Sequence, residues 1–374
     1  MKKFSKALLA ILIVFSTFMI AKPVKAEGEG ACTVGTNEYA VCGTTTTLKT
    51  YLTMKQDATV PNLTVTYTVS AGSAVDGTGG YQSVKAGISI NDVTVSNAVF
   101  SSTADTANSA TANEAGITNR IAVKKDISVD FTKVKFISPG IYRYIITQTA
   151  VVSPFELVRE STTTVDVIIV NDENGKLKVE GYLAYDGTFT KGAHETANAN
   201  DKDDKFVIYY HTVSLEVTKK VEGNQADRGK NWNFTVQLSN LGNGTTILRD
   251  ENSDVTPVSG YKADEDGKLT LEFVIKHGQK LILDSIPSGA KVTVTETEAN
   301  QDGYTTTYKV LENGAHTGNS ASDVTLSAEN GTEIEVINTK AGNVPTGIMT
   351  AILPGSILVA ASVIYFAVRK NEEE

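Results

Sequence analysis

The sequence predicts an all-β protein built from two tandem immunoglobulin-like β-sandwiches. Segments 63–69, 165–170, 269–275 and 292–296 alternate with a period of two and are rich in Val, Thr, Ile and aromatic residues. Asn-Gly at 174–175 and Asp-Gly at 266–267 are turn signals beside such segments. No helical periodicity is sustained outside the two ends of the chain, so packed sheets are the expected architecture.

The N-terminus has the pattern of a secretory signal peptide. A basic opening is followed by the apolar run 7–21, which is short for a membrane span, and by small residues up to Ala26. Residues 1–26 are therefore expected to direct export and to be removed after Ala26.

The C-terminus has the pattern of a membrane anchor. Residues 348–368 carry no charge and are long enough to cross a bilayer, and Arg369 and Lys370 follow directly, as expected for the start of a cytoplasmic tail at 369–374. Residues 341–347 form a linker in front of this span, and they end in Val344, Pro345, Thr346 and Gly347.

Bulk properties exclude several classes of function. The net charge of -9 argues against nucleic acid as a partner. Neither turn signal has the spaced carboxylates of a calcium loop, so no metal site or cofactor is expected. The sequence also lacks the short motifs of serine hydrolases and zinc proteases, and the four histidines are scattered. An enzyme acting on an external substrate is therefore not expected.

An internal repeat divides the body into two copies, 44–213 and 214–340. Segment 138–149 can be laid on 286–297, which brings Gln148 onto Glu296. Segments 65–69 and 232–236 match in the same way, and so do 207–211 and 334–338. In this alignment each copy has a lysine on its first strand: Lys49 in the first and Lys219 in the second.

Three residues of the second copy could together form an amide crosslink. Lys219 lies on the first strand, Glu296 on a middle strand and Asn338 on the last strand. A lysine buried among apolar side chains loses its proton because desolvation disfavours the charged form, and it then becomes a nucleophile. A carboxyl kept neutral in the same site can bind the asparagine carbonyl and shuttle protons. Ammonia would leave, and a Lys219–Asn338 isopeptide bond would remain. Taken singly, each of the three has the ordinary explanation of a polar side chain in contact with solvent.

These motifs resemble two known families. Val-Pro-Thr-Gly, an apolar span and a short charged tail resemble the sorting signal of Gram-positive surface proteins, although no residue separates Pro345 from Thr346. The L-x-V-x-K, V-T-E and I-x-V-x-N motifs at 215–219, 294–296 and 334–338 look like isopeptide-forming sandwich domains. Together with 61–67 and 139–144, they make the chain similar to the T-antigen-type major pilins.

The resemblance implies a structural pilus shaft subunit at the cell surface. A sortase would cut after Thr346 and join it to a lysine of the next identical subunit, and the finished fibre would be attached to cell-wall peptidoglycan. Ancillary pilins and a host surface ligand are further possible partners. The alternative is an ancillary pilin or a monomeric wall-anchored adhesin, with its first domain as the binding surface.

Two features of the first copy depart from the family. Gln148 is a poor proton shuttle and His211 offers no carbonyl to attack, so the sequence predicts that this copy lacks an isopeptide bond. Segment 27–43 contains Cys32 and Cys42, for which a disulfide is expected in an exported chain; free thiols or a thioester are the alternatives.

The lysine that would accept the neighbouring subunit follows from the family position alone. In the family it lies in the first domain, just before the last strand. Lys205 and Lys202 occupy that region here, and Lys205 borders the strand directly. A solvated charged loop explains both lysines equally well.

Overall fold

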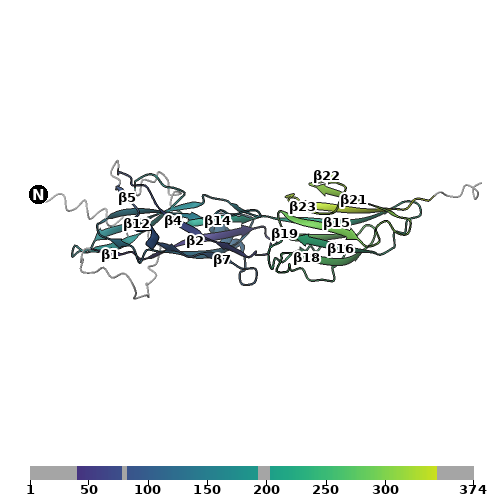
Figure 1. Cartoon of the computed structure of the whole chain (residues 1–374), viewed down its shortest axis with the longest axis horizontal. Coiled ribbons are helices and arrows are strands. Elements are labelled where there is room, and N and C mark those ends of the chain that lie inside the picture. Colours follow the sequence, from purple (N-terminus) through teal and green to yellow (C-terminus); the bar gives the residue numbers. More distant parts are fainter. Residues whose placement is uncertain (1–39, 78–81, 193–202, 343–374) are drawn as a thin grey trace, which may run out of the picture.

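The computed structural model describes residues 40–77, 82–192 and 203–342, and it confirms the all-β prediction. Two β-sandwiches lie end to end and give the molecule an elongated shape (Figure 1). Within these ranges no helix is both long and apolar enough to cross a membrane. The predicted signal peptide 1–26 and the predicted span 348–368 lie outside them.

The first sandwich packs two five-stranded sheets against each other. One sheet has the order β13 (Leu177–Asp186), β12 (Thr162–Asn171), β10 (Gly140–Gln148) and β4 (Tyr67–Ala71), and β5 (Val84–Ala86) also pairs with β10. The other has the order β11 (Phe155–Leu157), β14 (Lys205–Tyr210), β2 (Thr45–Met54), β8 (Ile121–Asp130) and β6 (Thr94–Val95). Short pieces complete it: β1 (Val41–Cys42) with β9 (Lys135–Phe136), β3 (Leu63–Val65) with β7 (Ala98–Phe100), η2 (Ile90–Asp92) and α2 (Ser109–Glu114).

The second sandwich packs a six-stranded sheet against a four-stranded sheet. The larger sheet has the order β17 (Leu248–Arg249), β19 (Lys280–Pro287), β15 (Thr212–Glu222), β24 (Thr332–Thr339), β21 (Thr305–Glu312) and β22 (Ala315–Gly318). The smaller has the order β18 (Leu269–Ile275), β16 (Trp232–Ser239), β20 (Ala290–Glu296) and β23 (Val324–Leu326).

The two sandwiches share a pairing pattern that agrees with the internal repeat. In each, the first strand runs parallel to the last: β2 with β14, and β15 with β24. In each, a second pair is antiparallel: β4 with β10, and β16 with β20. The exact domain boundaries expected from the sequence stay a prediction.

Period-two alternation produces the hydrophobic interior. In β18 the residues Leu269, Leu271, Phe273 and Ile275 are buried, and the residues between them are exposed. Strand side chains point alternately to the two faces, so one face of this strand contributes wholly to the core. The turn signals are confirmed as well, since Gly175 and Gly267 both adopt φ values near +70 to +80° that favour glycine.

One predicted strand divides between two pairings. Segment 63–69 reads as a continuous strand, but β3 pairs with β7 whereas β4 pairs with β10. The change takes place at Thr66, whose carbonyl accepts a hydrogen bond from the backbone N–H of Thr149. A strand that turns a corner keeps its alternation, and for that reason the sequence pattern did not reveal the break.

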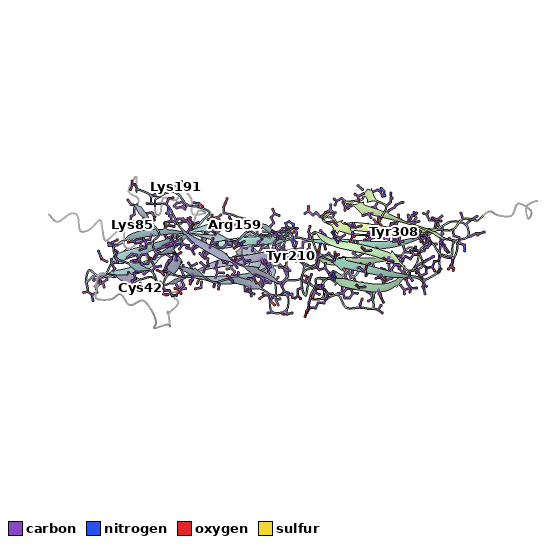
Figure 2. The ribbon with its side chains drawn as sticks, in the orientation of Figure 1. Cys42, Lys85, Arg159, Lys191, Tyr210 and Tyr308 are labelled. Carbon is purple, nitrogen blue, oxygen red and sulfur yellow. The ribbon has the colours of Figure 1, made fainter. Side chains whose placement is uncertain are left out.

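The junction between the sandwiches is one residue long. β14 ends at Tyr210, which lies where the two sandwiches meet (Figure 2), and β15 begins at Thr212. The backbone N–H of His211 donates to the carbonyl of Pro154 at 2.8 Å, and the His211 carbonyl accepts from the N–H of Ser288 at 3.0 Å. The connecting residue is therefore bonded to both sandwiches.

Side-chain hydrogen bonds also cross the junction. The N–H of Thr59 donates to Ser285 Oγ at 2.9 Å, and the Thr59 hydroxyl donates to the carbonyl of Thr246 at 2.7 Å. Asn62 Nδ2 donates to the carbonyl of Asn243 at 2.9 Å. These bonds hold a loop of the first sandwich against the second.

Candidate functional site

The second sandwich buries a lysine between its two sheets. In β15 the side chains of Leu215, Val217, Lys219 and Val221 alternate into the interior. The Lys219 side chain has no exposed surface. A charged group is costly in such a place unless a partner offsets the lost hydration.

The partner comes from the opposite sheet. Glu296 ends β20, and its Oε2 lies 2.7 Å from Lys219 Nζ. Asn338 on β24 donates from Nδ2 to the other carboxylate oxygen, Oε1, at 2.5 Å. The residues Lys219, Glu296 and Asn338 are 1%, 2% and 0% exposed. The structure therefore brings together the three residues singled out from the sequence, with Glu296 bridging the other two.

Strand pairing explains why Lys219 and Asn338 lie close to each other. β15 and β24 are parallel neighbours, and Lys219 is the register partner of Val336. Asn338 is two residues further along β24 and thus faces the same interior. The lysine and the asparagine are diagonal neighbours on one sheet.

Aromatic rings make the surroundings apolar. Lys219 Nζ lies 4.7 Å from the ring centroid of Trp232 and 5.8 Å from that of Phe234, both on β16. Burial lowers the pKa of Lys219, and the hydrogen bond that Lys219 donates to Glu296 opposes this shift. Asn338 Oδ1 is buried without a hydrogen-bond partner among the described atoms. The role of Trp232 and Phe234 in covering the lysine was not foreseen from the sequence.

The first sandwich places Gln148 at the matching position. Gln148 is the register partner of Tyr67, as Glu296 is the register partner of Phe234. Gln148 is 2% exposed, and within the described part of the chain neither its Nε2 nor its Oε1 has a hydrogen-bond partner. A buried amide that gains no hydrogen bond from the protein destabilises the fold.

The alignment of Lys49 with Lys219 is wrong by one residue. Lys49 faces away from the sandwich interior and forms an ion pair with Asp204, Nζ to Oδ2 3.0 Å. Its neighbour Thr50 points inward, and the Thr50 hydroxyl lies 2.5 Å from the hydroxyl of Tyr67. The sequence did not reveal the correct register, because β2 buries residues on both of its faces along its second half and the alternation is lost there.

His211 is also distant from the position expected of an acceptor. It lies between β14 and β15, and its Nε2 is 2.6 Å from Glu156 Oε2, with 39% of the imidazole side chain exposed. The first sandwich therefore does not bring Lys49, Gln148 and His211 together.

The remaining predicted residues are scattered or lie outside the described ranges. Lys205 begins β14 beside Lys49, and its Nζ lies 3.9 Å from Asp203 Oδ1. Cys42 ends β1. Cys32, Lys202 and residues 344–347 are outside the described residues, so the disulfide and the sorting motif stay predictions.

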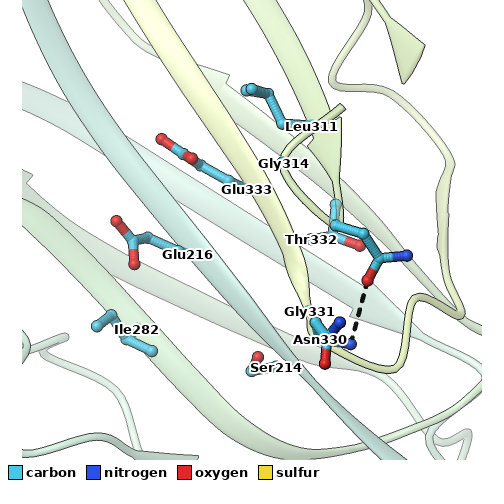
Figure 3. A pocket seen from close by; sticks show the side chains of 10 residues that line it. Ser214, Glu216, Ile282, Leu311, Gly314, Asn330, Gly331, Thr332 and Glu333 are labelled. Carbon is cyan, nitrogen blue, oxygen red and sulfur yellow. Dashed lines mark hydrogen bonds between the residues drawn. The ribbon is translucent and has the colours of Figure 1, made fainter. Parts of the chain in front are cut away.

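A separate polar pocket lies at the other end of β24. It has a volume of about 330 Å³ and is lined by the register partners Glu216 and Glu333, among other residues (Figure 3). Lys280 Nζ lies 3.4 Å from Glu216 Oε2, and the Thr218 hydroxyl donates a hydrogen bond to Glu333 Oε1. Among the residues that the structure describes, no group of three or more metal-ligating side chains is found.

Comparisons with solved structures show where this fold of two tandem sandwiches is already known. The crystal structure of the major pilin from Streptococcus pyogenes superposes with a TM-score of 0.56 at 22% identity, over 81% of this chain and 100% of that chain. The major pilin T3.2 of the same species gives a TM-score of 0.54 at 22% identity, over 80% and 100% of the two chains.

Sequence comparisons agree with the structural ones. A pilin of Streptococcus pyogenes serotype M1 is 24% identical over 256 residues, 66% of this chain and 72% of that protein. The pilus tip adhesin Cpa of Streptococcus pyogenes is 32% identical over 108 residues, 28% of this chain and 13% of that protein. Residues 213–340 match the family described as a domain of unknown function, DUF7601. The resemblance to Gram-positive major pilins is confirmed.

Proposed function

We propose that this chain is a structural shaft subunit of a Gram-positive pilus, stiffened by an isopeptide bond between Lys219 and Asn338. The observation that carries the proposal is the burial of Lys219, Glu296 and Asn338 in mutual contact, in a chain with the fold of major pilins. The function is structural, and the bond between Lys219 and Asn338 is a single self-modification without turnover.

The bond would form by aminolysis of the asparagine side chain. Transfer of a proton from Lys219 to Glu296 leaves both groups neutral, which low polarity favours. After a half-turn of the Asn338 amide, protonated Glu296 donates to Oδ1, and Lys219 Nζ attacks Cγ. The new C–N bond forms, the bond from Cγ to Nδ2 breaks, and Nδ2 leaves as ammonia with a proton that Glu296 relays from the lysine.

A bond at this place would bear tension along the fibre. Force that enters the second sandwich along β15 would pass through the bond from Lys219 to Asn338, close to the point where the chain leaves β24. The residues between them would then carry no load. Backbone hydrogen bonds contribute about 1 kcal/mol net each, so a sandwich held by them alone would shear open more easily.

Assembly would use the two ends of the chain. Export through the Sec route would remove residues 1–26, and the span 348–368 would hold the subunit in the membrane until a sortase cuts after Thr346. The Thr346 carbonyl would pass to a lysine of the next subunit and, at the base of the fibre, to peptidoglycan. Sequence position favours Lys205 or Lys202 as that lysine, and a Cys32–Cys42 disulfide would pin the N-terminal segment.

The proposal is tested by the intact mass of residues 27–346 with and without reduction. One isopeptide bond lowers the mass by about 17 Da as ammonia leaves, and a disulfide lowers it by about 2 Da more, which reduction restores. A digest should locate the loss at Lys219–Asn338. If the mass shows no loss of ammonia, the crosslinking part of the proposal is wrong.

A second candidate is an ancillary pilin or a wall-anchored adhesin. The likeness to a pilus tip adhesin favours it. So does the first sandwich, where the inward-facing residue of β2 beside Tyr67 is Thr50 and not a lysine. The two candidates differ in denaturing gels of cell-wall extracts. A shaft subunit gives a ladder of covalent homo-oligomers, whereas an adhesin gives a single band or joins a ladder made of another protein.

A further inference from the structure

Lys85 has its amine held in a fixed position although its side chain is exposed. Lys85 Nζ donates to the carbonyl of Pro139 at 2.8 Å and to Ser138 Oγ at 3.0 Å. It also lies 5.1 Å from the ring centroid of Tyr142. Exposed lysine amines usually sample many rotamers, and this one has three interactions that limit them.

The loop that precedes β10 is shaped around this amine. Gly140 has a φ of +146°, which favours glycine, and a Cβ built there would come 2.9 Å from Lys85 Nζ. The Tyr142 hydroxyl donates to the carbonyl of Ser138 at 2.9 Å and lies 2.9 Å from Ser138 Oγ. Segment 139–144, one of the segments that resemble major pilins, contains Pro139, Gly140 and Tyr142. The proposed shaft function does not by itself explain this segment.

Lys85 lies at the end of the molecule where a preceding subunit would dock. β10 begins beside Lys85 and runs toward the second sandwich, where Ser153 Oγ meets the carbonyl of Ser288 at 3.5 Å. Lys85 is therefore in the half of the first sandwich that is remote from the junction (Figure 2). Ile137, on the same loop, is 67% exposed and offers an apolar contact next to the amine.

The length of the C-terminal linker favours an acceptor at this end. The last described residue, Gly342, follows β24 at the opposite end of the molecule (Figure 1). Four further residues lead to Thr346 and span at most about 14 Å. When two subunits stack end to end, the Thr346 carbonyl of one can reach only an amine near the free end of the first sandwich of the next.

We propose that Lys85 is the amine that receives Thr346 of the preceding subunit, an inference that rests on the shaft function proposed above. The neutral Lys85 Nζ attacks the Thr346 carbonyl carbon, which the sortase cysteine holds as a thioester. The C–N bond forms and the C–S bond breaks, the cysteine leaves as thiolate, and the amine loses its extra proton to the enzyme. Ser138 and Pro139 orient the attacking nitrogen and are positioning residues.

Two other described lysines of the first sandwich, Lys205 and Lys191, lack this combination of features. Lys205 lies beside Lys49, which is the fifth of the ten residues of β2, and it faces Asp203. Lys191 is exposed, and its backbone carbonyl accepts a hydrogen bond from Arg143 Nη1 at 2.7 Å. This bond fixes the backbone of Lys191 but does not orient its side-chain amine. Lys85 is thus proposed in place of Lys205, and Lys202 lies outside the described residues.

The test uses the full chain expressed from its own locus in its own host, with cell-wall extracts run on denaturing gels. Lys85→Arg keeps the positive charge and donors but supplies no nucleophilic amine, so we expect the ladder of oligomers to disappear and folded monomer to remain. Lys191→Arg, Lys202→Arg and Lys205→Arg are matched controls that should keep the ladder. Mass spectrometry of wild-type oligomers should find a peptide in which Thr346 is joined to Lys85.

The outcomes separate this inference from the shaft function. No ladder in the wild type would overturn the shaft function, and the inference with it. Two results would overturn the inference and leave the shaft function intact. In one, Lys85→Arg still forms the ladder that wild type forms. In the other, the ladder disappears only in Lys202→Arg or in Lys205→Arg. Ser138→Ala should slow the appearance of the ladder without changing the melting temperature of the monomer.

Discussion

Gln148 holds in the first sandwich the position that Glu296 holds in the second. Each ends a strand, each is nearly fully buried, and each is the register partner of an aromatic residue, Tyr67 or Phe234. Glu296 contacts a lysine and an asparagine, whereas the amide of Gln148 makes no hydrogen bond in the described part of the chain. The same position in the fold is therefore hydrogen-bonded to two polar side chains in the second sandwich and to none of the described side chains in the first.

Replacing Glu296 should prevent the crosslink and weaken the second sandwich. Glu296→Gln keeps the shape of the side chain but cannot take the proton from Lys219. The crosslink should therefore not form, and the intact mass of the variant should show no loss of ammonia. Without the crosslink, β15 and β24 lose their covalent tie and Lys219 stays a buried amine without a carboxylate partner, so the melting transition of the second sandwich should move to lower temperature. Intact mass and calorimetry check both expectations.

The control for this variant is Glu180→Gln, which removes a carboxylate of the exposed ion pair with Lys178. It should change neither the mass deficit nor the second transition. Ammonia loss that continues in Glu296→Gln would show that Glu296 is not the proton shuttle.

Replacing Gln148 by an apolar residue of similar shape should stabilise the first sandwich. Gln148→Met removes two buried polar atoms that lack partners, and an unsatisfied buried group costs about 1–3 kcal/mol. We expect the melting temperature of the first transition to rise and the second to stay unchanged. A fall in that melting temperature would mean that the amide has a partner, such as an internal water molecule, that stabilises the fold.

The ion pair between Arg143 and Asp166 should be essential to the first sandwich. Both side chains are fully buried, and Arg143 bonds the two carboxylate oxygens at 2.7 Å each. Asp166→Ala leaves the guanidinium without its counter-charge, so we expect a loss of about 3–5 kcal/mol in chemical denaturation. The double variant Arg143→Met with Asp166→Ala should be more stable than Asp166→Ala alone, because it also removes the unpaired charge. A single variant as stable as wild type would contradict this account.

The pH dependence of stability should depend in part on Asp284. Burial, followed by the neighbouring Asp250, raises the pKa of Asp284 to about 6, and Asp57 of the first sandwich adds to the shift. Between pH 4 and 6 the folded state then binds more protons than the unfolded state, so the unfolding free energy falls as pH rises through this window.

Asp284→Asn should remove that pH dependence. We expect the variant to match wild type at pH 4 and to exceed it at pH 7.5 by on the order of 1–2 kcal/mol, allowing for partial solvent exposure. Melting curves at both pH values, with Asp266→Asn in an exposed turn as the control, measure the difference. Equal stability of wild type and Asp284→Asn at pH 7.5 would contradict the raised pKa.

The sequence predicted the second sandwich more fully than the first. In 215–221 and 334–338 the alternation is regular, so it placed Lys219 and Asn338 on the interior face without structural information. In β2 the residues Tyr51 and Thr53 are buried on the face opposite to Leu52. Burial on both faces removes the period-two signal, and Lys49 was therefore assigned to the wrong side.

Features that depend on distant pairings could not be predicted in this way. The surroundings of Lys85 require β5 to pair in parallel with β10, and the two segments are about fifty residues apart in the chain. The short helix α2, of six residues, is too brief to give a periodic pattern. Both features depend on tertiary contacts more than on local sequence preference.

The single-residue junction at His211 has a mechanical consequence for a filament. Because the backbone of His211 is bonded to Pro154 on one side and Ser288 on the other, the two sandwiches resist bending and twisting relative to each other. The described junction between the sandwiches is then not a soft joint. In a filament of such units, bending would be confined to the contacts between successive copies, and those contacts would set its persistence length.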